Sequence, residues 1–160
     1  MSSLFWFIGV AVLALAAFVV LLGAWIIPEN ESGLVIKKFG KALPPGQLLA
    51  LEGEAGYQAD LLPPGWHFSL WRWRYRVVRV PMITVRPGEI ALVVAADGDA
   101  IPSERILGSE VECDDFQDAR AFLQAGGEKG RQLAFLTAGT YRINPALFQV
   151  VTTHNCEHFG

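Results

Sequence analysis

The longest run of apolar residues lies at the N-terminus, where Leu4–Ile27 forms 24 consecutive positions without a charge. At 1.5 Å per residue this run predicts a helix of about 36 Å, which can cross a hydrocarbon core of about 30 Å. Pro28 is expected to end the helix. We therefore predict that residues 1–28 are a membrane anchor, marked at its ends by Leu4, Trp6, Trp25 and Ile27.

A cleaved signal peptide would need a basic N-terminal region, a shorter apolar core and a small-residue cleavage site. The first residues, MSSLFWF, contain no Lys or Arg, and GAWIIPEN offers no such site. We expect an uncleaved anchor that passes once through the membrane. The alternative is a helical hairpin buried in one leaflet.

Basic residues near the ends of the anchor set its expected orientation. None precedes it, whereas Lys37, Lys38 and Lys41 follow it. Because basic flanks stay in the cytoplasm, the positive-inside rule predicts a cytoplasmic body, which for a bacterial protein means the inner face of the plasma membrane.

The remaining chain alternates short β-branched or aromatic runs with Gly- and Pro-containing turns, a pattern typical of strands. PENESGLVIKKFG (28–40) resembles PGEIALVVAADG (87–98), and LPPGWHFSLWRWRYRVV (62–78) resembles LTAGTYRINPALFQVV (136–151). We therefore predict that residues 29–153 form one α+β domain, mostly antiparallel β, built from two related strand–turn–strand modules. Residues 154–160 are interpreted as the truncated start of a further element.

One short helix is expected within the second module, in DDFQDARAFLQAGG (114–127). Asp114 or Asp115 is predicted to cap its N-terminus, and Gly126 to stop it. Its apolar stripe, with helical spacing, consists of Phe116, Ala119, Phe122 and Leu123. We expect this stripe to cover a small sheet.

The stretch WRWRYR places aromatic residues and arginines in strict alternation. This pattern favours a half-buried strand. Its two predicted faces are Trp71, Trp73, Tyr75 and Val77 on one side, and Arg72, Arg74 and Arg76 on the other. A nucleic-acid surface would need both kinds accessible together. The arginines are therefore interpreted as a solvated face, a lipid contact or a subunit contact, with Trp71 and Trp73 opposite them.

Composition adds little support for an enzyme or a nucleic-acid binder. The net charge is −3, so no global basic field favours nucleic acid. The chain has no Gly-x-Ser-x-Gly elbow, phosphate loop or dinucleotide fingerprint. We predict no cofactor and no catalytic residue.

The most suggestive chemical cluster is HNCEH at the C-terminus. His154, Cys156 and His158 would point the same way on a strand, and imidazole and thiolate groups suit Zn²⁺. No fourth ligand is evident. These three residues are weak metal candidates, and a polar start to the next element is the preferred interpretation.

Several blocks occur in a recognisable order: the apolar anchor, SGLVIKKFGKALPPG, GEAGYQADLLPPGWHF, PGEIALVVAADG, VECDDFQDARAFLQAGGEKGRQ and AGTYRINPALFQV. Together they resemble the N-terminal, membrane-proximal portion of a bacterial flotillin-like protein of the SPFH (stomatin, prohibitin, flotillin; band-seven) superfamily. The resemblance runs from about Pro28 to Val151.

The resemblance implies a non-enzymatic scaffold that organises membrane microdomains. Its expected partners are the lipid bilayer, further copies or longer flotillin-like subunits, and an NfeD-type membrane protein. The family's coiled-coil stalk is missing, since no heptad segment occurs in the sequence. The alternatives are an accessory subunit of a membrane protease or transporter complex, and a membrane-anchored metal-dependent enzyme.

Overall fold

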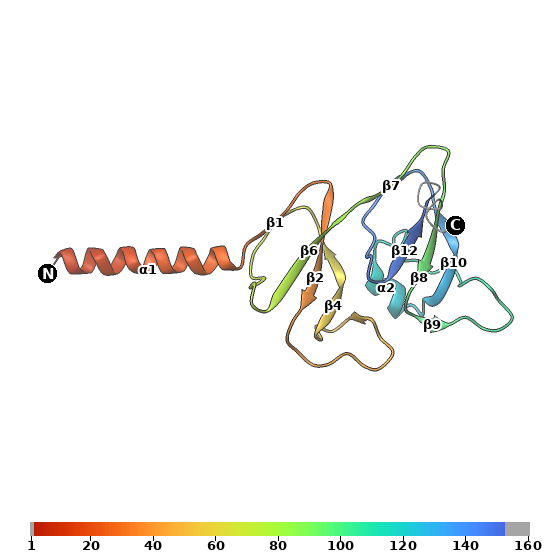
Figure 1. The fold of residues 1–160 in the computed structure, drawn as a ribbon, viewed down its shortest axis with the longest axis horizontal. Coiled ribbons are helices and arrows are strands. Elements are labelled where there is room, and N and C mark those ends of the chain that lie inside the picture. The colour runs from red at the N-terminus through yellow and green to blue at the C-terminus, as the bar shows by residue number, and fades with distance from the viewer. Residues whose placement is uncertain (1, 153–160) are drawn as a thin grey trace, which may run out of the picture.

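A computed structural model describes residues 2–152 and consists of one long N-terminal helix followed by a β-rich body (Figure 1). The helix is α1 (Ser2–Leu22). The first half of the body contains β1 (Trp25–Ile27), β2 (Glu31–Lys37), β3 (Leu49–Ala50), β4 (Gly56–Leu62), β5 (Gly65–His67) and β6 (Tyr75–Pro81). The second half contains β7 (Ile83–Val85), β8 (Ala91–Ala95), β9 (Asp99–Ala100), α2 (Ala119–Gln124), β10 (Glu128–Leu136), β11 (Gly139–Tyr141) and β12 (Phe148–Val151). The predicted α+β class with mostly antiparallel sheets is confirmed.

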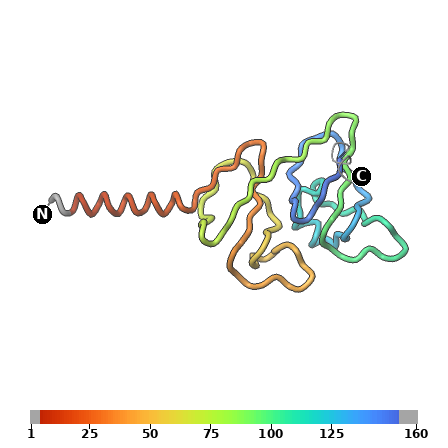
Figure 2. The backbone as a smooth tube through the Cα atoms, in the orientation of Figure 1, coloured from red at the N-terminus to blue at the C-terminus, as the bar shows by residue number. Residues whose placement is uncertain are grey.

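The body consists of two units with the same topology, residues 25–81 and residues 83–151 (Figure 2). In the first unit β1 pairs with β5, and the four-stranded sheet has the order β3-β4-β2-β6. In the second unit β11 pairs with β7, and the sheet has the order β9-β10-β8-β12. Each strand of one unit therefore has a counterpart in the other, which explains the repeats seen in the sequence.

The register of the strands is repeated as well. Leu34 of β2 pairs with Leu61 of β4 next to a register shift. Leu92 of β8 pairs with Phe135 of β10 next to a shift at the corresponding place. Because an irregularity of this kind bends and twists a sheet locally, its repetition gives the two sheets a similar curvature. Leu34 and Leu92 are therefore equivalent positions, and so are Leu61 and Phe135.

A hydrogen-bonded turn precedes the last strand of each unit. The carbonyl oxygen of Trp71 accepts from the N–H groups three and four residues ahead, at 2.9 and 2.8 Å. The carbonyl oxygen of Asn144 accepts from the corresponding N–H groups at 3.1 and 2.9 Å. The turns at 71–74 and 144–147 are thus equivalent.

The sheets and their covering elements form successive layers. On one side of the first sheet, the β1–β5 pair packs so closely that a Cβ atom added at Gly33 would collide with the side chain of Ile27. On the other side, Leu34 is buried, and Leu61 shares a cavity with Ala119 and Arg142 of the second unit. The second unit therefore covers the face of the first sheet that carries Leu34 and Leu61, here called the inner face.

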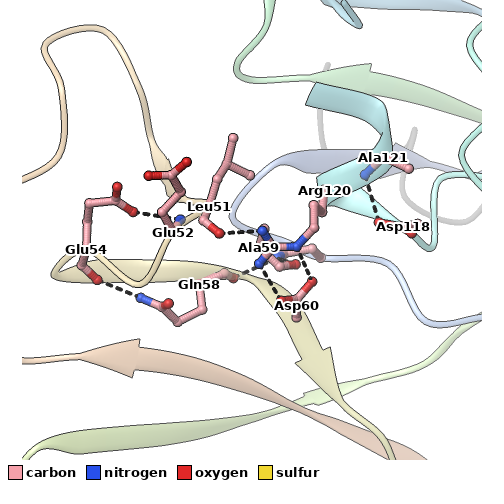
Figure 3. Close-up of polar contacts among 10 residues, drawn as sticks. Leu51, Glu52, Glu54, Gln58, Ala59, Asp60, Asp118, Arg120 and Ala121 are labelled. Carbon is pink, nitrogen blue, oxygen red and sulfur yellow. Dashed lines mark hydrogen bonds and ion pairs between the residues drawn. The ribbon is translucent and has the colours of Figure 1, made fainter. Parts of the chain in front are cut away.

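Polar contacts fix the two units to each other. The buried amide of Asn144 donates to the carbonyl oxygens of Gln58 and Ala59 at 3.2 and 2.8 Å. Arg120 of α2 forms an ion pair with Asp60 of β4 at 2.6 Å and also donates to the Leu51 carbonyl oxygen (Figure 3). The hydrogen bond to Asp60 raises the pKa of Arg120, so this guanidinium stays charged.

The main core lies between the second sheet and α2. Phe116, Phe122 and Phe148 are buried there with ring centroids 5.0–6.2 Å apart. Tilted and edge-on contacts of this kind are favourable for aromatic rings. Three residues of the predicted stripe, Ala119, Phe122 and Leu123, lie on α2 and pack in this cluster, as expected. Phe116 is buried in the same cluster but precedes the helix with a φ of 63°, so its predicted place on the helix is wrong.

The predicted ends of both helices need correction. α1 ends at Leu22, so Trp25 and Ile27 belong to β1 and not to the anchor helix. The physical reason is that the backbone groups of β1 pair with those of β5. If the helix continued through residues 25–27, the backbone groups of β5 would lose these partners.

The cap of α2 is Asp118, whose carboxylate accepts from the N–H of Ala121 at 2.8 Å. Asp114 and Asp115, the predicted capping residues, have positive φ angles of 51° and 50° and lie in the preceding turn. Residues in this conformation cannot begin a right-handed helix. Gly126 follows the helix with a φ of 77°, as the prediction of a glycine stop requires.

The predicted continuous strand through WRWRYR is also wrong. Trp71 to Arg74 form the turn described above, and β6 begins only at Tyr75. Alternation in sequence gave the wrong result because the N–H groups of Arg74 and Tyr75 bond back to Trp71 instead of to a neighbouring strand. The arginines at 72, 74 and 76 therefore do not share one strand face.

Candidate membrane interface

α1 is long and apolar enough to cross a membrane. Its 21 residues correspond to about 31 Å at 1.5 Å per residue. The window Phe5–Leu22 is entirely exposed, so no part of the body covers it. N-terminal signal sequences share these properties. Leu4 and Trp6 lie within this helix, as predicted.

The body holds the end of α1 through residues 69–74, a segment that includes the turn at 71–74. The N–H groups of Leu70 and Arg72 donate to the carbonyl oxygens of Gly23 and Leu22, at 3.3 and 3.4 Å. These are among the last carbonyls of the helix and the link after it, which have no partner within α1. The turn therefore closes the C-terminal end of the helix and fixes it against the first unit.

Trp25 is anchored at the same place. Its indole N–H donates to the Leu70 carbonyl oxygen at 2.7 Å. The guanidinium carbon of Arg72 lies 4.6 Å from the centre of the Trp25 ring, a cation–π distance. Arg72 was predicted to contact lipid or a partner, and in the structure its guanidinium also packs on Trp25.

Large apolar side chains remain exposed around this junction. Trp66 and Trp73 have 64% and 65% of their surface accessible, and Phe68 and Ile26 are also exposed. Trp66 and Phe68 stack with their ring centres 6.3 Å apart. We call this set of four side chains the aromatic collar, because it lies on the β1–β5 pair and the turn next to the end of α1.

Basic side chains lie beside the aromatic collar. Arg74 and Arg76 are exposed, and Arg74 lies 5.8 Å from the centre of the Tyr75 ring. Lys38 donates to the Arg72 carbonyl oxygen at 2.9 Å, and Arg79 donates to the Ile26 carbonyl oxygen at 3.2 Å. Apolar rings and cations at the end of a spanning helix are what the boundary between lipid tails and headgroups accommodates.

Sequence reasoning found only part of this surface. It named Trp71 and Trp73, but Trp71 is only partly exposed. It did not name Trp66, Phe68 or Ile26. The sequence does place Trp66 and Phe68 on either side of His67, a spacing that puts both rings on the same side of a strand. Their common exposure follows from β5 pairing with the short β1 at the edge of the body.

The remaining candidate chemical groups are potential metal ligands and one buried thiol. No three His, Cys, Asp or Glu side chains within that range lie close enough together to hold a metal ion. The metal candidates His154, Cys156 and His158 lie outside the described residues. Burial raises the pKa of the Cys113 thiol, which keeps it protonated and a weak nucleophile.

Comparisons of the chain with protein-family models, with curated proteins and with solved structures found no match.

Proposed function

We propose that this chain is a non-enzymatic scaffold subunit of a bacterial plasma membrane, with α1 as an uncleaved anchor and the first unit seated on the headgroups. The observation that carries the proposal is the aromatic collar. Its exposed side chains lie next to the point where α1 leaves the body. An exposed set of this kind on a water-facing surface would favour association or aggregation.

The architecture supports a scaffold more than an enzyme. Its two units are joined through the buried Asn144, and each has the same hydrogen-bonded framework. The ordered sequence blocks resemble an SPFH-type domain, whose family members assemble on membranes. On this proposal the partners are the bilayer, further copies or longer flotillin-like subunits, and an NfeD-type membrane protein. The positive-inside rule supports a cytoplasmic body.

Hydrogen exchange of the full chain in lipid nanodiscs tests the seating of the first unit. Residues 65–75 should exchange more slowly in nanodiscs that contain anionic lipid than in nanodiscs of neutral lipid. Reversing Arg72, Arg74 and Arg76 to Glu should remove this difference, because each cation near an anionic surface is worth about 1 kcal/mol.

A matched control reverses Lys129, Arg131 and Arg142 in the second unit to Glu, which gives the same change in net charge. This control should keep the difference between the two lipids. If residues 65–75 exchange equally in both kinds of nanodisc in the unaltered chain, the first unit is not seated on the headgroups. Size determination of the detergent-extracted chain then tests assembly, and a strict monomer would argue against the scaffold.

A further inference from the structure

One face of the second sheet carries exposed apolar side chains and two basic ones, and it is equivalent to a face of the first sheet that the second unit covers. We call it the distal face, and it carries Leu92, Lys129, Arg131, Leu133 and Phe135. Leu92 is 53% exposed, whereas its equivalent Leu34 is only 5% exposed. Phe135 is 52% exposed, whereas its equivalent Leu61 is partly covered by the second unit.

The repeat explains this contrast. In the first unit, the inner face is covered by parts of the second unit that include Ala119 and Arg142. No described element follows β12 to cover the distal face in the same way. Leu92 and Phe135 of the distal face are therefore apolar, like the covered residues of the first sheet, but they stay exposed.

The bilayer that holds α1 cannot cover the distal face. The layers run from α1 through the β1–β5 pair and the first sheet to the part of the second unit that contains Ala119 and Arg142, and then to the second sheet. Figure 1 shows α1 leaving the body at the end opposite to β8 and β10.

Charges on the distal face are arranged so that they match a rotated copy of the same face. Lys129 and Arg131 lie at the beginning of β10, and both are exposed. The segment after Gly108 runs parallel to β10, because Gly108 bridges to Gln132. It places the exposed Glu110 and Glu112 beside Ala134 and Phe135, toward the end of the strand.

We propose that the distal face is the site at which two copies of this chain associate through a two-fold axis. The two second sheets would then pack face to face at about 10 Å, as in a β-sandwich. Leu92 and Phe135 of both copies would form the apolar centre. The basic beginning of β10 in each copy would face the acidic end of β10 in the other.

This proposal rests on the scaffold function, since it names the surface through which copies meet. Its geometry adds one consequence. Two copies joined at their distal faces carry their α1 helices at opposite ends of the pair. Such a pair holds two bilayers, or two parts of one bilayer, against each other.

Light scattering of the full chain in detergent micelles during size-exclusion chromatography tests the association. The unaltered chain should be a dimer, and the variant with Leu92→Glu and Phe135→Glu should dissociate at least tenfold more readily, because four carboxylates would enter the apolar centre. Phe39→Glu is the matched control, since Phe39 is 62% exposed but lies in the first unit. It should leave the dimer unchanged.

A charge exchange tests the two-fold arrangement itself. Arg131→Glu and Glu110→Arg should each weaken the dimer, and the chain that carries both should recover at least part of the loss. Vesicles that hold the unaltered chain should cluster, whereas vesicles with the Leu92→Glu and Phe135→Glu variant should stay dispersed.

The proposal is overturned if the unaltered chain is monomeric at about 100 μM, a concentration at which even a weak specific pair forms. It is also overturned if a dimer forms that Phe135→Glu does not affect. In the second case copies meet elsewhere and the scaffold function survives. Loss of lipid-dependent protection at residues 65–75 would instead remove the scaffold function and leave the dimer untouched.

Discussion

Asn144 is a buried side chain that joins the two units. It is completely buried, and its amide donates to the carbonyl oxygens of Gln58 and Ala59 at 3.2 and 2.8 Å. Its Oδ1 atom accepts from the N–H of Ala146 at 3.0 Å. Asn144→Ala removes all three hydrogen bonds and leaves the carbonyl oxygens without their amide donor.

The size of the effect follows from these contacts. A hydrogen bond contributes about 1 kcal/mol net, so the three together are worth about 3 kcal/mol of unfolding free energy. With a urea dependence of about 2 kcal/mol per molar, the midpoint of unfolding should fall by roughly 1.5 M. Asn30→Ala is the control, since the side chain of Asn30 is exposed. It should move the midpoint by less than about 0.3 M.

Two optical probes can show whether the units separate. All five tryptophans lie in α1 or the first unit, so their fluorescence reports on that half alone, whereas circular dichroism reports on the whole body. The two probes should give one transition in the unaltered chain and separate transitions in Asn144→Ala. A midpoint within about 0.3 M of the unaltered chain would refute the reasoning that this amide joins the units.

Two further predictions concern stability. The N–H of Ser109 donates to Glu128 at 2.7 Å, and this bond, with the Arg105 contact, holds the pKa of Glu128 below its ordinary value of about 4.3. The ionised Glu128 contributes its full stabilisation above that value, and this contribution is lost as the pH falls through the lowered pKa. Below about pH 4, the free energy of unfolding should therefore fall less steeply with decreasing pH in Glu128→Gln than in the unaltered chain. Gly98 has a φ of +131°, and a Cβ atom there would collide with the carbonyl oxygen of Gly127, whereas Gly46 has a φ of +94° with open space around it. Gly46→Ala should cost about 1–2 kcal/mol of unfolding free energy through its backbone conformation alone; Gly98→Ala should cost at least about 2 kcal/mol more, and equal losses in urea unfolding would contradict the collision.

The sequence by itself determined the features that depend on local composition and period. The helix at the N-terminus was predictable because the 18 residues Phe5–Leu22 are apolar enough and long enough to cross a membrane. The two β modules were visible because Leu34 and Leu92 stand in matching β-branched runs. The buried stripe of α2 followed from helical spacing.

Tertiary structure alone decided where these elements end and which surfaces stay free. Trp25 belongs to a strand and not to the helix because β1 pairs with β5, in which its partner is His67. The alternation in WRWRYR was broken by a turn that closes the end of α1. Leu34 and Leu92 have the same local sequence pattern, yet one is buried and the other exposed. The difference arises because a second unit lies on the first sheet and nothing described lies on the second, a long-range fact that no local pattern encodes.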